Sequence, residues 1–416
     1  MILRLAVASL YARGLTVGMT ILAIALSVAL FLGVEKVRTG AKASFADTIS
    51  GTDLIVGARS GSVQLLLYSV FRIGNATNNV TWESYLDIAA RPDVEWIVPI
   101  SLGDSHRQFR VMGTSQAFFT HYKYRQGRSL QVAQGDIISD LFDAVIGADV
   151  ARTLSYSIDD PIIVAHGLSS FTEHKDQPFR VSGILEKTGT PVDRTVIVSM
   201  EAIEAIHVDW QSGAQIPGQS TPIEVIRQMD LKPKAVTAAL VGVESPLRTF
   251  ALQRAINNYP EEPLLAILPG VALQELWGIV GVAETALLAV SAMVVVTALI
   301  GMMATIFSGL NERRREMAIY RAMGARPGTI LGLLVLEAML VAAAGAILGL
   351  AMLYLGLAVG QPMVDRAYGL WLPIEMPSLR ELTVLVVVTC AGAIVSLVPA
   401  YRAYRLSLAD GMMVKT

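Results

Sequence analysis

Cysteine and charge are both scarce in this sequence, and each shortage excludes a class of protein. One cysteine, Cys390, occurs among 416 residues, so the chain by itself can build neither a disulfide framework nor a thiolate metal site. Charged residues make up 16% of the chain, against roughly 25% in an average soluble domain. The net charge of −2 gives no support for nucleic-acid binding. With 53% hydrophobic residues and a mean hydropathy of +0.53, the chain is expected to be a membrane protein.

Motifs for catalysis and nucleotide binding are also absent from the sequence. It contains no G-x-x-x-x-G-K-[ST] loop and no Gly-Lys dipeptide, so it lacks a phosphate-cradling loop of that kind. It contains no G-x-S-x-G motif, which disfavours a membrane hydrolase. We therefore expect that this chain is not an enzyme, and that it has no catalytic residue, no metal ligand and no cofactor of its own.

What the sequence has instead is four long apolar runs. A spanning helix needs about 20 apolar residues, and the runs that reach this length are Leu15–Val34, Thr285–Leu310, Pro327–Val364 and Leu382–Ala400. The third contains one ionisable residue, Glu337. The predicted fold is a membrane protein with four transmembrane α-helices and a large mixed α/β extracytoplasmic domain between helices 1 and 2.

Basic residues gather in three places and set the predicted orientation. They lie before the first run, between the second and third, and after the fourth, at Arg4, Arg13, Arg313, Arg314, Arg315, Arg321, Arg326, Arg402, Arg405 and Lys415. Cytoplasmic loops carry an excess of Lys and Arg. We therefore expect a multi-pass protein of a bacterial inner (cytoplasmic) membrane, with cytoplasmic N- and C-termini.

This orientation divides the chain into segments of alternating location. The predicted segments are a cytoplasmic amphipathic lead-in (1–14), transmembrane helix 1 with a stalk (15–45), the extracytoplasmic domain (46–270), a stalk with transmembrane helix 2 (271–310), a cytoplasmic coupling segment (311–326), transmembrane helix 3 (327–360), a short extracytoplasmic loop (361–381), transmembrane helix 4 (382–400) and a cytoplasmic tail (401–416). The stalks are expected to be rigid, the alternative being a break near Gly278 or Gly281.

The extracytoplasmic domain has the pattern of a mixed α/β fold. Strands are expected where Val, Ile and Phe cluster between Gly, Asp or Pro, at Asp53–Ala58, Glu95–Leu102, Gln108–Gly113, Ala144–Gly147, Pro161–Ala165, Phe179–Leu185, Thr195–Ser199 and Ala235–Val243. Helices are expected at Trp82–Ala90, Met200–Val208 and Pro246–Asn257.

The coupling segment carries more than membrane topology requires. Asn311 is placed to cap a new helix, and Gly324 is placed to end it. The apolar residues between them recur at helical spacing, which predicts a short amphipathic helix that can fill a groove on a partner. The residues predicted to serve this docking are Asn311, Glu312, Arg313, Arg314, Arg315, Glu316, Met317, Ile319, Tyr320, Arg321, Met323 and Gly324. The alternative is a stop-transfer cluster resting on anionic lipid.

These residues also resemble a known family. Asn311–Ala325 is similar to the signature N-x-R-x-[RK]-E-[IFM]-[AG]-[ILV]-x-[RK]-[AS]-[ILM]-G-A of the MacB/FtsX-type (type VII) ABC transporter permeases. Further likenesses to this family, including its MacB periplasmic core, lie at Leu3–Arg13, Ala144–Leu154, Phe179–Glu186, Pro191–Ser199 and Val398–Met412.

The resemblance implies partners and a mechanism. The coupling segment would dock on an ABC ATPase subunit, present in two copies, which would bind the ATP and Mg. Two copies of this permease would form a homodimer, and its long helices would carry motion to the periplasmic domain (mechanotransmission). Such a system would export or extract a lipophilic, peptide or lipoprotein cargo, with a periplasmic adaptor or lipoprotein as a further partner. Two alternatives stay open: a non-transporting relay that regulates a periplasmic partner such as a cell-wall hydrolase, and a metal (zinc)-linked system with a periplasmic partner.

Three further groups of residues have both a functional and a structural interpretation. Glu337 lies inside a span, where ionisable groups are costly, and we favour a structural bond to a neighbouring helix or to the coupling segment. Two glycine pairs offer flat faces for a dimer seam or for packing within one bundle, Gly345 with Gly349 and Gly356 with Gly360. The histidines fit no metal-ligand spacing and are interpreted as ordinary residues of the outer domain: His106, His121, His166, His174 and His207.

Overall fold

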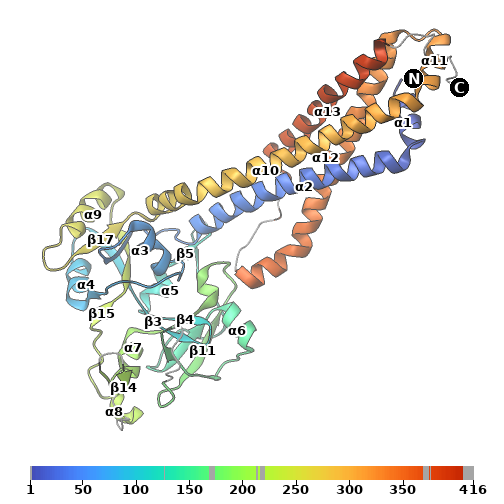
Figure 1. Ribbon diagram of the computed structural model, residues 1–416. Coiled ribbons are helices and arrows are strands. Elements are labelled where there is room, and N and C mark those ends of the chain that lie inside the picture. The colour runs from blue at the N-terminus through green and yellow to red at the C-terminus, as the bar shows by residue number, and fades with distance from the viewer. Residues whose placement is uncertain are drawn as a thin grey trace. The chain divides into compact units, whose positions relative to one another are not determined.

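The chain folds into two compact units. The computed structural model describes residues 2–125, 127–167, 174–211, 214–215, 221–368, 374 and 376–405. The helical unit comprises Met1–Gly40, Gly281–Met363 and Leu372–Thr416, and the outer unit comprises Ala41–Val280 with Val364–Trp371. Figure 1 shows the helices and strands of both units.

The helical unit is built from four long apolar helices, which confirms the four predicted spans. They are α2 (Gly14–Asp47), α10 (Pro269–Glu312), α12 (Pro327–Tyr368) and α13 (Leu379–Arg405), and each is long and apolar enough to cross a membrane. They run alongside one another (Figure 1), around a core that includes Ile24, Val28, Leu299, Val341 and Val388. Aliphatic side chains such as Met293 and Ile347 are exposed on the outside of this unit, as lipid contact requires.

Two short helices complete this unit, and two helix ends differ from expectation. These short helices are α1 (Ile2–Tyr11) and α11 (Arg314–Ala322). Helix α12 was expected to end at 360 but continues to Tyr368 with Pro362 inside it. The reason is that the apolar run itself reaches Val364, and a single proline can be carried within a helix at the cost of a kink. Helix α10 is unbroken at Gly278 and Gly281.

The outer unit is built on one mixed sheet, which confirms the predicted fold class. The strand order is β17-β1-β16-β3-β4-β12-β8-β11-β7, with β10 beside β3 and β9 beside β11. The β12–β4 and β11–β8 pairs are parallel and the other pairs are antiparallel. The strands are β1 (Leu54–Ala58), β3 (Val94–His106), β4 (Phe109–Thr114), β7 (Val132–Gly135), β8 (Asp143–Ile146), β9 (Pro161–Ile162), β10 (Ala165–His166), β11 (Phe179–Leu185), β12 (Thr195–Ser199), β16 (Ala238–Val243) and β17 (Leu264–Ile267).

Helices cover both faces of this sheet because the strand residues are apolar on both sides. Successive strand residues point to opposite faces, and in β1 Ile55 belongs to one core cluster while Leu54 and Val56 belong to another. The first cluster includes residues of α3 (Ser62–Ser69) and α5 (Ala117–His121). The second includes residues of α4 (Trp82–Ala89), α7 (Met200–Ile206) and α9 (Thr249–Asn257).

The remaining elements of the outer unit are short. They are β2 (Val80–Thr81), β5 (Lys123–Tyr124), β6 (Arg128–Ser129), α6 (Ala148–Leu154), β13 (Trp210–Gln211), β14 (Ala214–Gln215), α8 (Ile223–Ile226) and β15 (Ala235–Val236), with the 3-10 turns Pro191–Arg194 and Pro246–Arg248. The strand predicted at Pro161–Ala165 is instead β9 and β10, because these two segments pair with different partners, β11 and β3.

Candidate functional site

The junction between α10 and α11 lies at Arg313, and the predicted cap at Asn311 is wrong. Asn311 and Glu312 belong to the last turn of α10. The backbone N–H of Arg313 still donates to the Gly309 carbonyl at 3.1 Å, as it does inside a helix, so no new helix can begin at Asn311. The side chains of the predicted docking residues Asn311, Glu312, Arg314 and Arg315 lie outside the described part of the chain.

The end of α11 follows the pattern predicted for Gly324. This glycine has a φ of +93°, a conformation that residues with a Cβ rarely adopt. The Ala325 N–H donates to the Tyr320 carbonyl, and the Gly324 N–H donates to the Arg321 carbonyl, each at 3.0 Å. These bonds satisfy carbonyls that a helix end leaves free. Pro327 then opens α12.

The apolar residues of α11 face two ways. Met317 is 9% exposed and packs with Leu310, Ile330 and Leu334 at one end of the bundle. Ile319 and Met323 are 57% and 71% exposed, and a spacing of four residues puts them on one face of the helix. The predicted stripe is therefore divided: Met317 contributes to the bundle core, and Ile319 with Met323 forms the apolar surface that a partner can reach.

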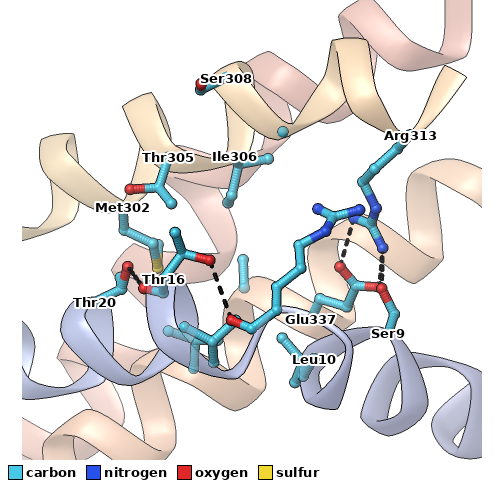
Figure 2. Close-up of a pocket in the computed structure, with 15 residues that line it drawn as sticks. Ser9, Leu10, Thr16, Thr20, Met302, Thr305, Ile306, Ser308, Arg313 and Glu337 are labelled. Atoms are coloured by element: carbon cyan, nitrogen blue, oxygen red, sulfur yellow. Dashed lines mark hydrogen bonds and ion pairs between the residues drawn. The ribbon is translucent and has the colours of Figure 1, made fainter.

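A buried ion pair fixes this junction to α12. Arg313 Nη1 donates to Glu337 Oε2 at 2.7 Å, and Arg313 Nη2 donates to Glu337 Oε1 at 2.5 Å (Figure 2). The same Nη2 also donates to the Ser9 hydroxyl of α1. Both ion-pair residues are buried, Arg313 at 5% exposure and Glu337 at 7%. A bidentate arginine–carboxylate pair is strong and directional, so α1, α12 and the start of α11 meet at one point.

Two further ionic contacts join Glu316 to this point. Glu316 Oε2 lies 3.7 Å from Arg13 Nη2 and 3.7 Å from Arg313 Nε. Glu316 is half exposed, at 50% of its side chain, so these contacts are weaker than the buried pair. The first turn of α11 is thereby linked to the segment between α1 and α2.

A small pocket lies beside the Arg313–Glu337 pair (Figure 2). It is lined by residues of α1, α2, α10 and α12, among them Thr16, Thr20, Met302 and Thr305. Its volume is about 160 Å³, whereas pockets for drug-sized molecules measure about 300–1,000 Å³. The pocket can hold a few waters or a small molecule.

The two predicted glycine pairs have different surroundings. A Cβ on Gly345 would lie 2.7 Å from Ile24 Cβ, and one on Gly349 would lie 2.6 Å from the Ala25 carbonyl oxygen. These glycines allow α12 to approach α2 of the same chain closely. Gly356 and Gly360 have nothing within 4 Å of the equivalent position.

The opposite end of the bundle holds an ionic network that the sequence reasoning did not predict. Glu35 accepts hydrogen bonds from Arg38 at 2.9 and 3.0 Å, and it lies 2.8 Å from Arg380. Lys36 lies 3.3 Å from Glu381. Arg38 lies 3.7 Å from Glu284, and the Tyr354 hydroxyl donates to Glu381 at 3.0 Å. The network joins α2, α10, α12 and α13. Its sequence signal was the group of charges that directly follows the first apolar run.

In the outer unit, three of the five histidines converge on a buried aspartate. One ring nitrogen each from His166, His174 and His207 and one carboxylate oxygen of Asp104 all lie within 4.8 Å of one another. Burial lowers the pKa of His174 to about 4, so its ring is neutral at ordinary pH. The spacing along the sequence did not predict this cluster, because Asp104 and His207 lie far from His166 and His174 in the chain and Asp104 falls inside a strand.

The other two histidines have ordinary structural roles. His106 is buried, and its ring nitrogens lie 2.6 Å from the Ile163 carbonyl oxygen and 2.9 Å from the Tyr156 hydroxyl. His121 stacks on Trp96 with a distance of 4.9 Å between ring centroids. Neither belongs to the cluster around Asp104.

Comparisons with known proteins match both units. Residues 17–257 match the family of the MacB-like periplasmic core domain, and residues 288–408 match the FtsX-like permease C-terminal family. The second match contains Arg313, Glu337 and the whole of α11.

Individual relatives agree with these family matches. The macrolide export ATP-binding/permease proteins MacB of Nitrobacter winogradskyi and Azoarcus sp. are 24% and 25% identical over 415 and 422 residues. These alignments cover 97% of this chain and 58% of each relative, so the chain spans little more than half their length.

Two solved periplasmic or extracellular regions also overlap with this chain. The periplasmic region of MacB from Actinobacillus actinomycetemcomitans gives a TM-score of 0.33 at 10% identity, over 56% of this chain and 94% of that one. The extracellular domain of the noncanonic ABC-type transporter YknZ from Gram-positive bacteria gives a TM-score of 0.29 at 12% identity, over 52% of this chain and 98% of that one. At these TM-scores the two structural matches add no support to the family assignment. On the two family matches, the chain belongs to the MacB/FtsX-type ABC transporter permeases, as a multi-pass membrane protein with a MacB-like periplasmic core domain.

Proposed function

We propose that this chain couples ATP hydrolysis by a separate ABC ATPase subunit to movement of its own periplasmic domain, for export or extraction of a lipophilic, peptide or lipoprotein cargo. In this proposal the N- and C-termini and α11 are cytoplasmic, in a bacterial inner membrane. Two permease copies work with two ATPase copies, and a periplasmic adaptor or lipoprotein receives the movement. The chain itself holds no nucleotide.

One observation carries the proposal: α11 presents an apolar surface while the residue directly before it is locked to the bundle. Ile319 and Met323 are exposed on one face of α11. Immediately before α11, Arg313 is bound to Glu337 of α12. A docking helix with a rigid attachment passes a displacement on to the bundle instead of absorbing it. Anchoring to lipid would need the exposed surface and would not need the buried pair.

The length of α10 supports transmission beyond the membrane. Its 44 residues, at 1.5 Å per residue, span about 66 Å, which is roughly twice the hydrocarbon thickness of a bilayer. Helix α2 has 34 residues. Both helices are therefore long enough to leave the bilayer and carry movement into the periplasmic domain.

The small volume of the pocket in the bundle favours action outside the membrane over passage through it. The pocket beside Glu337 measures about 160 Å³, which is too small for a peptide or a lipid, since drug-sized ligands already need about 300 Å³ or more. This supports a cargo that is handled at the periplasmic domain.

Cysteine labelling tests the orientation on which the proposal depends. In a Cys390→Ala background, Met323→Cys places an exposed thiol at the C-terminal end of α11, and Val225→Cys places one on α8 of the periplasmic domain. A membrane-impermeant thiol reagent added to whole spheroplasts should modify Val225→Cys and leave Met323→Cys unmodified until the membrane is opened. Modification of Met323→Cys in intact spheroplasts would refute the proposal.

Purification tests the partner. The affinity-tagged chain, extracted from its own membranes in mild detergent, should retain an ABC ATPase in equimolar amount, and Met323→Cys should cross-link to it. Recovery of the permease without any ATPase under conditions that keep the permease folded would contradict the proposal.

A further inference from the structure

Two paired strands bring the first two members of the histidine–aspartate cluster together. Asp104 lies in β3 and His166 in β10, and the two residues are direct partners in the antiparallel β3–β10 pair. Directly opposite residues in such a pair have Cβ atoms about 4.5–5.5 Å apart. The register between β3 and β4 shifts between Leu102 and Ser105. Asp104 therefore sits in a bulge, an irregularity that redirects a side chain.

The other two members approach from separate segments, and the backbone holds each in place. His207 is the C-terminal cap of α7, and its Nδ1 lies 2.7 Å from the Ile203 carbonyl oxygen. The backbone N–H of His174 donates to the Val164 carbonyl at 2.8 Å, two residues before His166. Four side chains that can bind a metal thus come together from β3, β10, the end of α7 and the segment at His174. The backbone that carries each of them is fixed.

The distances between these atoms are close to those between the ligands of a tetrahedral metal ion. His166 Nδ1 lies 3.1 Å from His207 Nε2 and 3.2 Å from Asp104 Oδ1, and His207 Nε2 lies 3.6 Å from Asp104 Oδ1. Zn²⁺ binds imidazole nitrogen and carboxylate oxygen at about 2.0–2.2 Å, so neighbouring ligands of a tetrahedral zinc ion lie about 3.3–3.6 Å apart. His174 completes the group within the 4.8 Å limit.

One buried polar atom of the cluster, His174 Nε2, has no hydrogen-bond partner within the described residues. Asp104 Oδ1 is also buried, and the ring nitrogens near it are His166 Nδ1 at 3.2 Å and His207 Nε2 at 3.6 Å. Asp104 and His174 are 3% and 4% exposed, and in the described part of the chain the ion-pair partners of Asp104 are His166 and His207, which carry a charge only when protonated. A buried carboxylate without a compensating charge is costly, and a buried polar atom without a partner is rare. A bound cation would satisfy both atoms and balance the charge.

The hydrogen bond of His207 also prepares its ring for a metal. A carbonyl oxygen can only accept, so Nδ1 of His207 must carry the proton that faces Ile203. In the neutral ring Nε2 then carries the electron pair, and Nε2 is the atom that lies near His166 and Asp104. Metal-binding histidines commonly donate their second N–H to a carbonyl or carboxylate in this way.

The chemistry of the donor set and its access indicate which ion fits. Imidazole nitrogens favour Zn²⁺ and its neighbours over Mg²⁺ or Ca²⁺, which prefer all-oxygen sites. Four protein ligands close a tetrahedral shell and leave no position for a reactive water, as in structural zinc sites. The side chains of His166 and His207 are 39% and 22% exposed, which gives an ion a route from solvent. Trp210 lies over the cluster, with its ring 4.6 Å from that of His174 and 5.0 Å from that of His166.

We propose that Asp104, His166, His174 and His207 form a four-coordinate Zn²⁺ site in the periplasmic domain. The ion would join β10 and the segment at His174 to the end of α7. The concentration of Zn²⁺ in the periplasm would then control how firmly these parts are held together. The site is independent of nucleotide and of any ATPase, and its test requires neither.

Metal binding is measured on the full-length chain, purified in detergent through a tag without histidine and stripped with chelator. The chain should take up an equimolar amount of Zn²⁺. With Co²⁺ as a probe it should show the intense visible absorption of tetrahedral cobalt, which Zn²⁺ then removes. Asp104→Asn and His207→Gln should each weaken Zn²⁺ binding by on the order of 100-fold or more, since even the loss of an outer hydrogen-bond partner costs about 10–100-fold. The matched control His121→Gln, outside the cluster, should bind like the unchanged chain.

Three results would each overturn the proposal. The first is the absence of stoichiometric Zn²⁺ uptake by the unchanged chain. The second is the weak absorption typical of octahedral cobalt, and the third is undiminished binding in both Asp104→Asn and His207→Gln. If a variant fails to fold by circular dichroism, the cobalt spectrum of the unchanged chain still decides the question. A metal-free cluster, in which His166 is hydrogen-bonded between Asp104 and His207, would give the first result.

Discussion

Arg313 and Glu337 form a bidentate ion pair that joins the residue directly before α11 to the interior of α12, with N–O distances of 2.7 and 2.5 Å. Both side chains are almost fully buried. A buried pair of this kind adds little net stability relative to a well-packed apolar pair, but removal of one partner leaves a charge buried without compensation. The pair is therefore a fixed point on which the orientation of α11 depends.

Replacement of one partner of this pair should destabilise the bundle and uncouple it. In Glu337→Gln, the Arg313 guanidinium keeps its charge and loses its buried counter-ion, with only the half-exposed Glu316 left 3.7 Å away, and breaking a buried pair typically costs about 3–5 kcal/mol. We expect a lower melting temperature of the detergent-solubilised chain and loss of permease-dependent ATPase stimulation. Thermal unfolding and ATPase assays of the reconstituted complex measure the two effects.

A double replacement separates the charge effect from the packing effect. In Arg313→Met with Glu337→Met no unpaired charge remains, so the double variant should be more stable than either single variant. It should nevertheless stay uncoupled, because the directional contact is gone. A double variant as unstable as the sum of the single ones would show that the two side chains act independently.

The two faces of α11 should respond differently to substitution. Met323→Asp alters a side chain that is 71% exposed, so the melting temperature should stay unchanged while ATPase docking is lost. Met317→Ala empties a buried position beside Leu310, Ile330 and Leu334, and truncation of a buried methionine typically costs about 2–5 kcal/mol. Melting curves and co-purification with the ATPase distinguish the two. If the Met323→Asp and Ile319→Asp variants both bind the ATPase normally, α11 is not part of the interface with the ATPase.

The contrast between Met317 and Met323 shows what the sequence could and could not predict. Helical period and the glycine stop predicted the short helix, and the long apolar runs predicted the four spans. Period alone does not say which apolar residue faces the bundle, because that depends on how α11 is turned against α12. The contacts that set this, such as the one between Arg313 and Glu337, join residues far apart in the sequence, here 24 positions.

The histidine–aspartate cluster was not predictable for a related reason. Metal motifs are recognised from sequence when ligands recur at short fixed spacing on one helix or loop. Here the contact between Asp104 and His166 is created by strand pairing, and His207 joins through the end of α7. Strand register over such distances is decided by the packing of the whole sheet. The sequence shows that an aspartate and three histidines are present, but it does not show that they lie together in the fold.

The glycines of α12 give a matched pair of substitutions. Gly349→Leu places a side chain where the Ala25 carbonyl oxygen already lies 2.6 Å from the added Cβ. It should force α12 away from α2 and cost at least the 1–3 kcal/mol typical of overpacking. At Gly356 an added Cβ meets nothing within 4 Å among the described residues, so Gly356→Leu should not destabilise the monomer, and its better helix propensity could only add to stability. Thermal unfolding in detergent measures both.

Gly356→Leu also tests the dimer seam. If Gly356 and Gly360 face a second copy, Gly356→Leu should lower the dimer fraction seen by cross-linking in membranes. The melting temperature of the monomer should not fall. An unchanged dimer fraction would place the seam elsewhere. A destabilised monomer would contradict the open surroundings of Gly356.

Acid should weaken the periplasmic domain through Asp140, in a pH range set by its partner. Arg227 donates to both carboxylate oxygens of Asp140 at 2.6 Å, and this hydrogen-bonded guanidinium lowers the pKa of Asp140 to about 2. An unfolded-state aspartate has a pKa of about 3.9. Because the folded-state pKa is the lower one, the stabilisation is fully present above about pH 4 and is lost as the pH falls toward 2.

The size of this effect should be small, because both side chains are 43% exposed and exposed ion pairs contribute about 0–1 kcal/mol. Asp140→Asn should therefore lower the free energy of unfolding by about 1 kcal/mol or less at pH 7, and the difference from the unchanged chain should vanish near pH 2. The control is Asp230→Asn, at an exposed position that forms no ion pair within the described residues. Urea unfolding followed by tryptophan fluorescence at several pH values measures both variants. A difference for Asp140→Asn that persisted unchanged at pH 2 would show that packing, and not the charge on Asp140, is responsible.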